Sequence, residues 1–134
     1  MNLLRDERGS ASVLIIGLSL ALILAIGLAV DGSRKALAAS RATSIAEEAA
    51  RAGAQALDPH NLADGGPAHV YPSESAAAAQ RYLAAAGMSG QVRAQAERIT
   101  VDTTDTLDTI FLGAIGISTL VVHGHGAADL VSDD

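Results

Sequence analysis

The chain contains no cysteine and very few aromatic residues. Phe111 and two tyrosines are the only aromatic side chains among its 134 residues. Without cysteine, no disulfide can staple an exported domain, and thiolate metal sites and cysteine nucleophiles are excluded. Hydrophobic residues still make up 49% of the chain, but alanine, which gains little from burial, supplies much of that share. We therefore expect a small core that is marginally stable alone and is helped by partners.

The net charge of −6 is distributed unevenly along the chain. Residues 1–57 carry six Arg or Lys against five acidic residues, whereas residues 58–134 carry three Arg against ten acidic residues. An acidic surface repels the phosphate backbone of nucleic acids. We therefore expect no nucleic-acid partner.

One long hydrophobic run lies near the N-terminus. Residues 10–30 are SASVLIIGLSLALILAIGLAV, twenty-one residues without a charge. A helix of about twenty apolar residues crosses the hydrocarbon core of a bilayer. Arg8 precedes the run and Asp31 follows it. The sequence therefore predicts a tail over residues 1–9 and a transmembrane helix over residues 10–31.

A cleaved signal peptide is the alternative interpretation of this run. Gly27 and Ala29 stand at positions −3 and −1 of a small-residue cleavage site near Ala29. Cleavage there would release a small secreted or tethered binding module. Against cleavage, the run is longer than the roughly 7–15 residues of a usual signal-peptide core, and the helical pattern continues beyond it.

Small residues recur at helical spacing in the span and beyond it. Steps of four residues predict a ridge along the span, at Gly17, Ala21, Ala25, Ala29 and Ser33. The helical signal then persists as an alanine-rich stalk over residues 32–57. Its heptad spacing predicts a seam at Ala38, Ala42, Ile45, Ala49, Ala52 and Ala56. Because small residues let another helix approach closely, we predict that the ridge and the seam are helix-packing surfaces.

Residues 5–57 resemble a known family. The run RDERGSASVLIIGLSLALILAIGLAVDGSRKALAASRATSIAEEAARAGAQAL is similar to the N-terminus of the TadE/TadG-like proteins of Flp (tight-adherence, Tad) pilus assembly. The shared pattern is a charged residue with RG, an apolar span ending in a VDG-type turn, and an alanine-rich helix closing in AARAGAQAL. The alanine-rich style resembles actinobacterial, TadG-like members.

This resemblance implies a structural, minor pilin-like protein rather than an enzyme. It implies a cytoplasmic N-terminus, a helix in the cytoplasmic membrane, and a distal domain that is extracytoplasmic or at the cell surface. The implied partners are membrane lipid and other Flp pilus-assembly proteins or pilins, with self-association through the long helix as a further option. Prepilins of this class carry a glutamate five residues after the cleaved glycine, where this chain has Leu14 after Gly9. We therefore expect no cleavage after Gly9.

The distal residues predict a linker followed by a small head. Residues 58–73 contain all three prolines and indicate a linker or loop. The head over residues 74–134 begins with a predicted helix at 74–86, for which Ser73 is the expected N-cap and Gly87 the expected terminating residue.

Beyond Gly87 the hydrophobic period changes to two, which is typical of strands. The alternating segments lie near residues 92–96, 99–103 and 118–127, with a short helix predicted over residues 106–115. The predicted fold class is therefore α+β: a long N-terminal helix, then a small antiparallel sheet of about three strands with one or two short helices, in the manner of pilins.

Two residue groups contain metal-ligand types without a diagnostic spacing. His123 and His125 would share one strand face, with Asp129 close behind, and these are ligand types for zinc. Asp102, Asp105 and Asp108 offer oxygen atoms to calcium, but their spacing is not that of an EF-hand. We therefore predict no metal site.

The remaining candidates for chemistry have simpler interpretations. His60 and His69 lie in the proline-rich segment and are expected to be solvated, whereas Gly113 and Gly116 indicate a turn rather than a phosphate-binding loop. We predict no cofactor and no catalytic residue.

Overall fold

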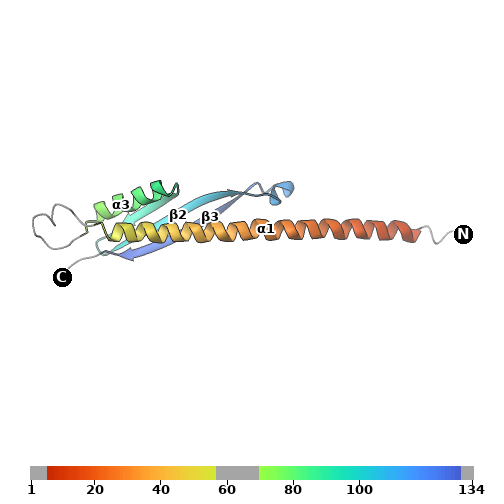
Figure 1. Cartoon of the computed structure of the whole chain (residues 1–134), viewed down its shortest axis with the longest axis horizontal. Coiled ribbons are helices and arrows are strands. Elements are labelled where there is room, and N and C mark those ends of the chain that lie inside the picture. The colour runs from red at the N-terminus through yellow and green to blue at the C-terminus, as the bar shows by residue number, and fades with distance from the viewer. Residues whose placement is uncertain (1–5, 57–69, 131–134) are drawn as a thin grey trace, which may run out of the picture. The chain divides into compact units, whose positions relative to one another are not determined.

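The computed structural model describes residues 6–56 and 70–130, with side chains from residue 9 onward. The chain divides into two compact units. The first unit combines the N-terminal residues up to Arg34 with the segment Asp108–Thr119. The second combines Lys35–Leu107 with the residues from Leu120 onward. Figure 1 shows the elements in chain order.

Helix α1 (Asp6–Ala54) contributes residues to both units. It has 49 residues and contains no proline. The helix predicted for the span and the stalk is thus continuous, and it ends at Ala54. Residues 30–32, the VDG motif on which the resemblance partly rests, are all helical. A single glycine lowers helix propensity by only about 1 kcal/mol relative to alanine, which good helix formers on either side offset.

The first unit contains a loop over residues 109–118 together with the part of α1 up to Arg34. The loop contains the short 3-10 helix η2 (Leu112–Ile115), which ends at Gly116 with φ of +92°. Glycine adopts this left-handed conformation without a Cβ clash. The Thr109 amide donates to the Ser118 carbonyl at 3.0 Å and closes the neck of the loop. Of the two glycines predicted to form a turn, Gly116 lies in a turn, whereas Gly113 lies within η2.

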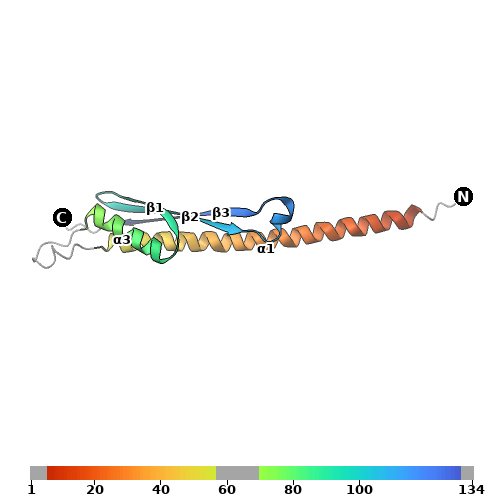
Figure 2. The same ribbon diagram turned by 90° about the horizontal axis from the view of Figure 1, so that it is seen from above.

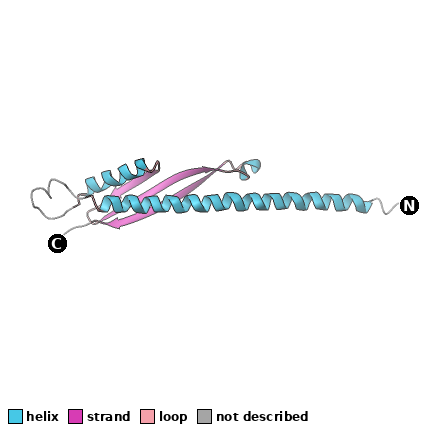
Figure 3. Cartoon of the chain, in the orientation of Figure 1, coloured by secondary structure: helices cyan, strands magenta, loops and turns pink. Residues whose placement is uncertain are grey.

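The second unit contains a three-stranded antiparallel sheet, drawn in magenta in Figure 3. Strands β1 (Ser89–Ala94), β2 (Arg98–Asp108) and β3 (Thr119–Asp129) are hydrogen-bonded in the order β1-β2-β3. The register of β1 and β2 places Val92 opposite Val101. The α+β fold class is therefore confirmed.

One face of the sheet is buried by helices. Buried side chains alternate along the strands, with Ile99 and Val101 from β2 and Val122 from β3. Helix α3 (Pro72–Ala85) contributes Leu83 to this core, and α1 contributes small residues, namely Ala42, Ala46, Ala49, Ala50 and Ala54. Figure 2 shows α3 and the second-unit part of α1 on the same side of the sheet.

Strand β3 approaches α1 to backbone contact. A Cβ atom added to Gly124 would lie 2.2 Å from the carbonyl carbon of Ala42, and one added to Gly126 would lie 2.3 Å from that of Ala46. The hydroxyl of Thr103 also donates to the Ala42 carbonyl at 2.9 Å. Because neither surface presents a side chain larger than a methyl group at these points, the helix and the strand pack without a gap.

Two predictions for the head are wrong. The helix expected over residues 106–115 is instead the end of β2, which runs to Asp108, followed by the loop that contains η2. Threonine-rich, alternating sequence favours a strand when one face can be buried. Ser73 is not the N-cap of α3, which begins at Pro72 after Tyr71. Proline suits the first helical position because its missing N–H needs no partner there.

The predicted end of this helix is confirmed. Gly87 has φ of +66°, and its amide donates to Ala84 at 3.1 Å. The next amide, of Met88, donates to Leu83 at 3.0 Å. These two bonds form a Schellman motif, which satisfies carbonyls at the helix end. The linker predicted over residues 58–73 lies mostly outside the described residues.

Replacing Gly126 by alanine should destabilise the second unit, because the added Cβ would overlap the backbone at Ala46. We expect a loss of about 1–3 kcal/mol in the free energy of unfolding, the usual range for overpacking. Denaturant unfolding of the full chain in detergent measures this through tyrosine fluorescence, since both tyrosines belong to this unit.

The matched control is Ala127→Val, which enlarges the next residue on the exposed face of β3. It should change the free energy of unfolding little. If Gly126→Ala were as stable as the wild-type protein, the close contact between β3 and α1 would not be needed by the fold.

Candidate functional site

Helix α1 exposes a continuous aliphatic surface in the first unit. Its exposed large residues are Val13, Leu14, Ile15, Ile16, Leu18, Leu20, Leu22, Ile23, Leu24, Ile26 and Leu28. By length and composition α1 is able to cross a membrane, and only 6% of its most apolar window is buried within the chain. A long apolar helix that its own chain leaves uncovered fits membrane anchoring.

The predicted small-residue ridge lies on this uncovered part of α1. Gly17, Ala21, Ala25 and Ala29 are all exposed. No large side chain of the described residues covers them, so the ridge is available to another helix. Its role in helix packing stays a prediction.

The predicted alanine seam has a different environment. Ala42 and Ala49 are fully buried within the chain, and Ala42 faces Gly124 of β3. The other seam residues are half-buried, namely Ala38, Ile45, Ala52 and Ala56. The small side chains of the seam therefore serve close packing of α1 against the chain's own sheet.

The Asp31 carboxylate organises the loop of the first unit. Only 1% of Asp31 is exposed. Its two oxygen atoms accept hydrogen bonds from three successive backbone amides, those of Ile110, Phe111 and Leu112, at 2.8–2.9 Å. These amides precede and begin η2, where a short helix leaves its first N–H groups without partners. The carboxylate therefore acts as a cap supplied by a segment distant in sequence.

Two further contacts hold this loop. Arg34 lies 3.8 Å from the Asp31 carboxylate, and its guanidinium donates to the Asp108 carbonyl at 2.9 Å. Phe111 packs on Gly27, where an added Cβ would lie 2.6 Å from the Phe111 side chain. In the sequence, Asp31 stands out only as the charge that ends the apolar run. The signal in the sequence for its partner segment is the uncharged, apolar character of residues 109–118.

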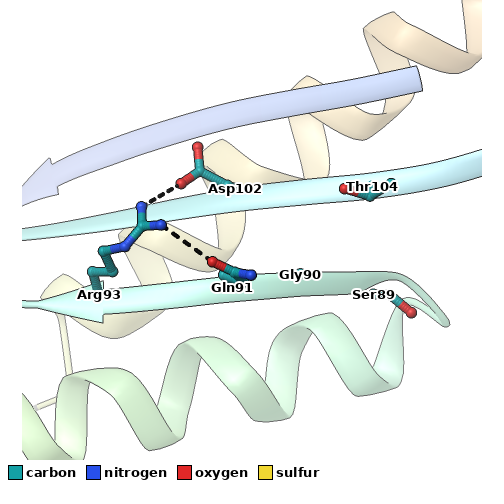
Figure 4. A pocket seen from close by; sticks show the side chains of 6 residues that line it. All are labelled: Ser89, Gly90, Gln91, Arg93, Asp102 and Thr104. Atoms are coloured by element: carbon teal, nitrogen blue, oxygen red, sulfur yellow. Dashed lines mark hydrogen bonds and ion pairs between the residues drawn. The ribbon is translucent and has the colours of Figure 1, made fainter. Parts of the chain in front are cut away.

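The exposed face of the sheet carries ordered polar pairs. The Asp102 carboxylate accepts from Arg93 at 2.8 Å and lies 2.8 Å from the ring nitrogen of His125. Figure 4 shows Arg93 reaching from β1 to Asp102 on β2, with a second bond to Gln91 at 3.1 Å. In these cross-strand pairs, the charged side chains of neighbouring strands bind one another on the exposed face of the sheet.

The family comparison matches the helical part of the chain. Residues 9–56 match the family model described as Flp pilus-assembly TadE/G-like. This segment is therefore similar to the TadE/G-like family. The match supports a function related to pilus assembly. No curated protein and no solved structure matches the chain significantly.

The TadE/G-like segment contains both specialised surfaces of α1. It includes the exposed aliphatic surface and the stripe of alanines under the sheet. It also includes Asp31, whose partners at residues 110–112 lie outside the matched segment. The contact between them therefore joins the family segment to the distal part of the same unit.

The residues considered as zinc ligands have other partners. His123 and His125 share the exposed face of β3, as predicted, together with Asp129. The Asp129 carboxylate accepts from Arg98 at 2.9 Å, however, and His123 lies 3.3 Å from the Thr104 hydroxyl. Within residues 6–56 and 70–130, no group of three or more metal-ligating side chains comes together.

The residues considered for calcium also do not converge. Asp102 and Asp108 lie at exposed-face positions of β2, whereas Asp105 lies on the opposite side and accepts from the Thr106 amide. His60 and His69 lie outside the described residues.

The Asp102 pair predicts an acid-dependent loss of stability. The hydrogen bond with His125 holds the pKa of the Asp102 carboxyl below its usual value of 3.8; burial opposes this shift, and Arg93 adds to it. Such a carboxylate stabilises the fold above its unfolded-state pKa, and the contribution is lost as the pH falls through the lower folded-state pKa. Asp102→Asn should therefore lower the Tm at neutral pH, and the difference from wild type should close below about pH 4.

Thermal unfolding of both proteins in detergent across this pH range provides the measurement. Glu97→Gln is the control for the loss of one exposed charge from the sheet unit. A Tm difference for Asp102→Asn that stayed constant down to the acid limit would show that ionisation of Asp102 does not stabilise the sheet.

Proposed function

We propose that this chain is a non-catalytic, single-pass membrane protein that acts in Flp pilus assembly as a TadG-like, minor pilin-like accessory protein. The observation that carries the proposal is helix α1, in which the matched TadE/G-like segment coincides with an exposed apolar surface long enough to cross a bilayer. In this proposal residues 1–9 are cytoplasmic, and the unit that contains the sheet is extracytoplasmic.

The geometry of the first unit favours an uncleaved span over a signal peptide. Cleavage after Ala29 would remove Gly27, on which Phe111 packs. It would also make Asp31 the second residue of the new chain, although its three hydrogen bonds require a fixed helical position. A helix that continues without a break through Gly27 and Asp31 suits a permanent anchor.

Topology and processing can be tested together, because the chain has no natural cysteine. A cysteine at Gln80, an exposed position on α3, should react with a membrane-impermeant maleimide in intact cells. Asn2→Cys is the matched control and should react only after lysis. Intact mass of the membrane-purified chain should show neither cleavage near Ala29 nor removal of residues 1–9.

Each of the other results would contradict a separate part of the proposal. Labelling of Asn2→Cys in intact cells would show the inverted orientation. A mature chain that starts just after Ala29 would support the secreted or tethered binding module instead. A mature chain that starts at Ser10 would show prepilin-type processing despite Leu14.

We further propose that assembly uses the ridge of Gly17, Ala21, Ala25 and Ala29, with a pilus-assembly protein or a second copy as the partner. Helices in lipid associate by close van der Waals packing, which requires small side chains at the contact. Ala21→Leu and Ala25→Leu keep the span apolar, but should weaken association by about 1–3 kcal/mol through added bulk. The measurement is the yield of crosslinked complex from gently extracted membranes.

Leu22→Ala serves as the control, because this residue projects about 100° away from Ala21 around the helix. Its crosslinking yield should stay near that of the wild-type protein. If both leucine variants crosslinked as well as wild type, the ridge would reflect only the alanine-rich composition.

A further inference from the structure

The loop over residues 109–118 is apolar and exposed. Its sequence, TIFLGAIGIS, contains no charged residue. Ile110 and Ile115 are each 60% exposed, and Phe111 and Ile117 are more than 40% exposed. Contiguous exposed apolar residues in a soluble protein indicate a binding surface or contact with a membrane.

Many backbone amides of this loop donate to acceptors within the protein. Asp31 accepts from the amides of residues 110–112. The amides of residues 109, 114, 116 and 117 donate to carbonyls of the same loop. Irregular backbone is tolerated at membrane depth only where its polar groups are satisfied by protein, and the buried carboxylate supplies the acceptors that a loop in hydrocarbon would otherwise lack.

The loop lies beside the apolar segment of α1 within the same unit. Phe111 packs on Gly27, and an apolar groove lies between the loop and the helix. The groove is lined by Ile23, Leu24 and Leu28 of α1 and by Phe111, Leu112, Ala114 and Ile115 of the loop. Since a helix rises about 1.5 Å per residue, Gly27 and Ile23 lie roughly 6 Å and 12 Å before Asp31 along α1.

We infer that residues 109–118 insert into the bilayer beside the span, as a second membrane-embedded segment whose apolar side chains contact lipid acyl chains. This inference rests on the proposed function, because it requires α1 to cross the membrane. Lipid is the occupant that the structure favours, since the exposed loop side chains continue the aliphatic surface of Ile23 and Leu28. Arg34, which binds the Asp108 carbonyl, then lies at the polar boundary, as basic side chains at membrane interfaces do.

Fluorescence quenching by lipids tests this insertion in the full chain. Single cysteines at Ile115 in the loop, Leu18 in the span and Gln91 on the exposed sheet are labelled with an environment-sensitive dye. Each protein is reconstituted into phosphatidylcholine vesicles that contain doxyl-labelled lipid. We expect the dyes at Leu18 and Ile115 to be quenched by the lipid and shielded from aqueous iodide, and the dye at Gln91 to show the reverse.

The three positions separate failure of the inference from failure of the proposed function. Quenching of Leu18 by lipid, with Ile115 accessible to iodide, would overturn loop insertion while leaving the span intact. Accessibility of Leu18 to iodide would instead overturn the span itself, and with it the inference. Circular dichroism of each labelled protein verifies that the secondary structure is retained.

A second pair of variants tests the role of Asp31. In the Ile115→Cys background, Asp31→Asn should reduce lipid quenching of the dye by about half or more, because an amide group has one acceptor oxygen where the carboxylate has two. Asp108→Asn removes one charge from the same unit, at an exposed position, and should leave the quenching unchanged. Equal quenching in the two variants would show that loop insertion does not need the Asp31 carboxylate.

Discussion

The contact on which the second unit depends is the close approach of β3 to α1. Gly124 and Gly126 bring the strand against the backbone at Ala42 and Ala46. A chain with so few aromatic residues cannot fill a wide gap between layers, so its core must be thin. Small residues on both surfaces remove the gap, and van der Waals contact between backbones takes the place of large buried side chains. The alanine-rich composition is therefore a requirement of this packing.

The first unit is held together differently, because the surface of its helix is apolar and is not covered by a sheet. Here the main polar interaction is the Asp31 carboxylate with three loop amides. A buried charge is tolerated when its hydrogen-bonding capacity is filled, as it is by these amides and the nearby Arg34. Helix α1 packs against the sheet through alanine in the second unit and exposes leucine and isoleucine in the first. The matched segment thus carries one surface that is buried by the sheet and one that is exposed and apolar.

In the proposed function, the chain acts through these surfaces rather than through catalysis. The span offers a ridge of small residues for another helix, and the sheet offers an exposed face of paired charges. Neither surface requires a cofactor in the proposed function. The zinc and calcium hypotheses concern residues that the sheet instead engages in cross-strand pairs or keeps apart.

The long helix, the α+β class and the helix end at Gly87 were predictable from the sequence, because each depends on a local pattern: apolar run length, residue period, or a glycine that tolerates positive φ. The partners of Asp31 and of Ala42 were not predictable, since they lie about eighty residues away along the chain. Residues 106–115 also show the difference between local patterns and contacts with distant segments. Their apolar and threonine content suited either a helix or a strand, and pairing of β2 with its neighbours decided for a strand as far as Asp108. Sequence by itself therefore determined the two α-helices and the apolar segments. Only the tertiary structure decided where β2 ends and which face each element buries, because both depend on contacts between distant segments.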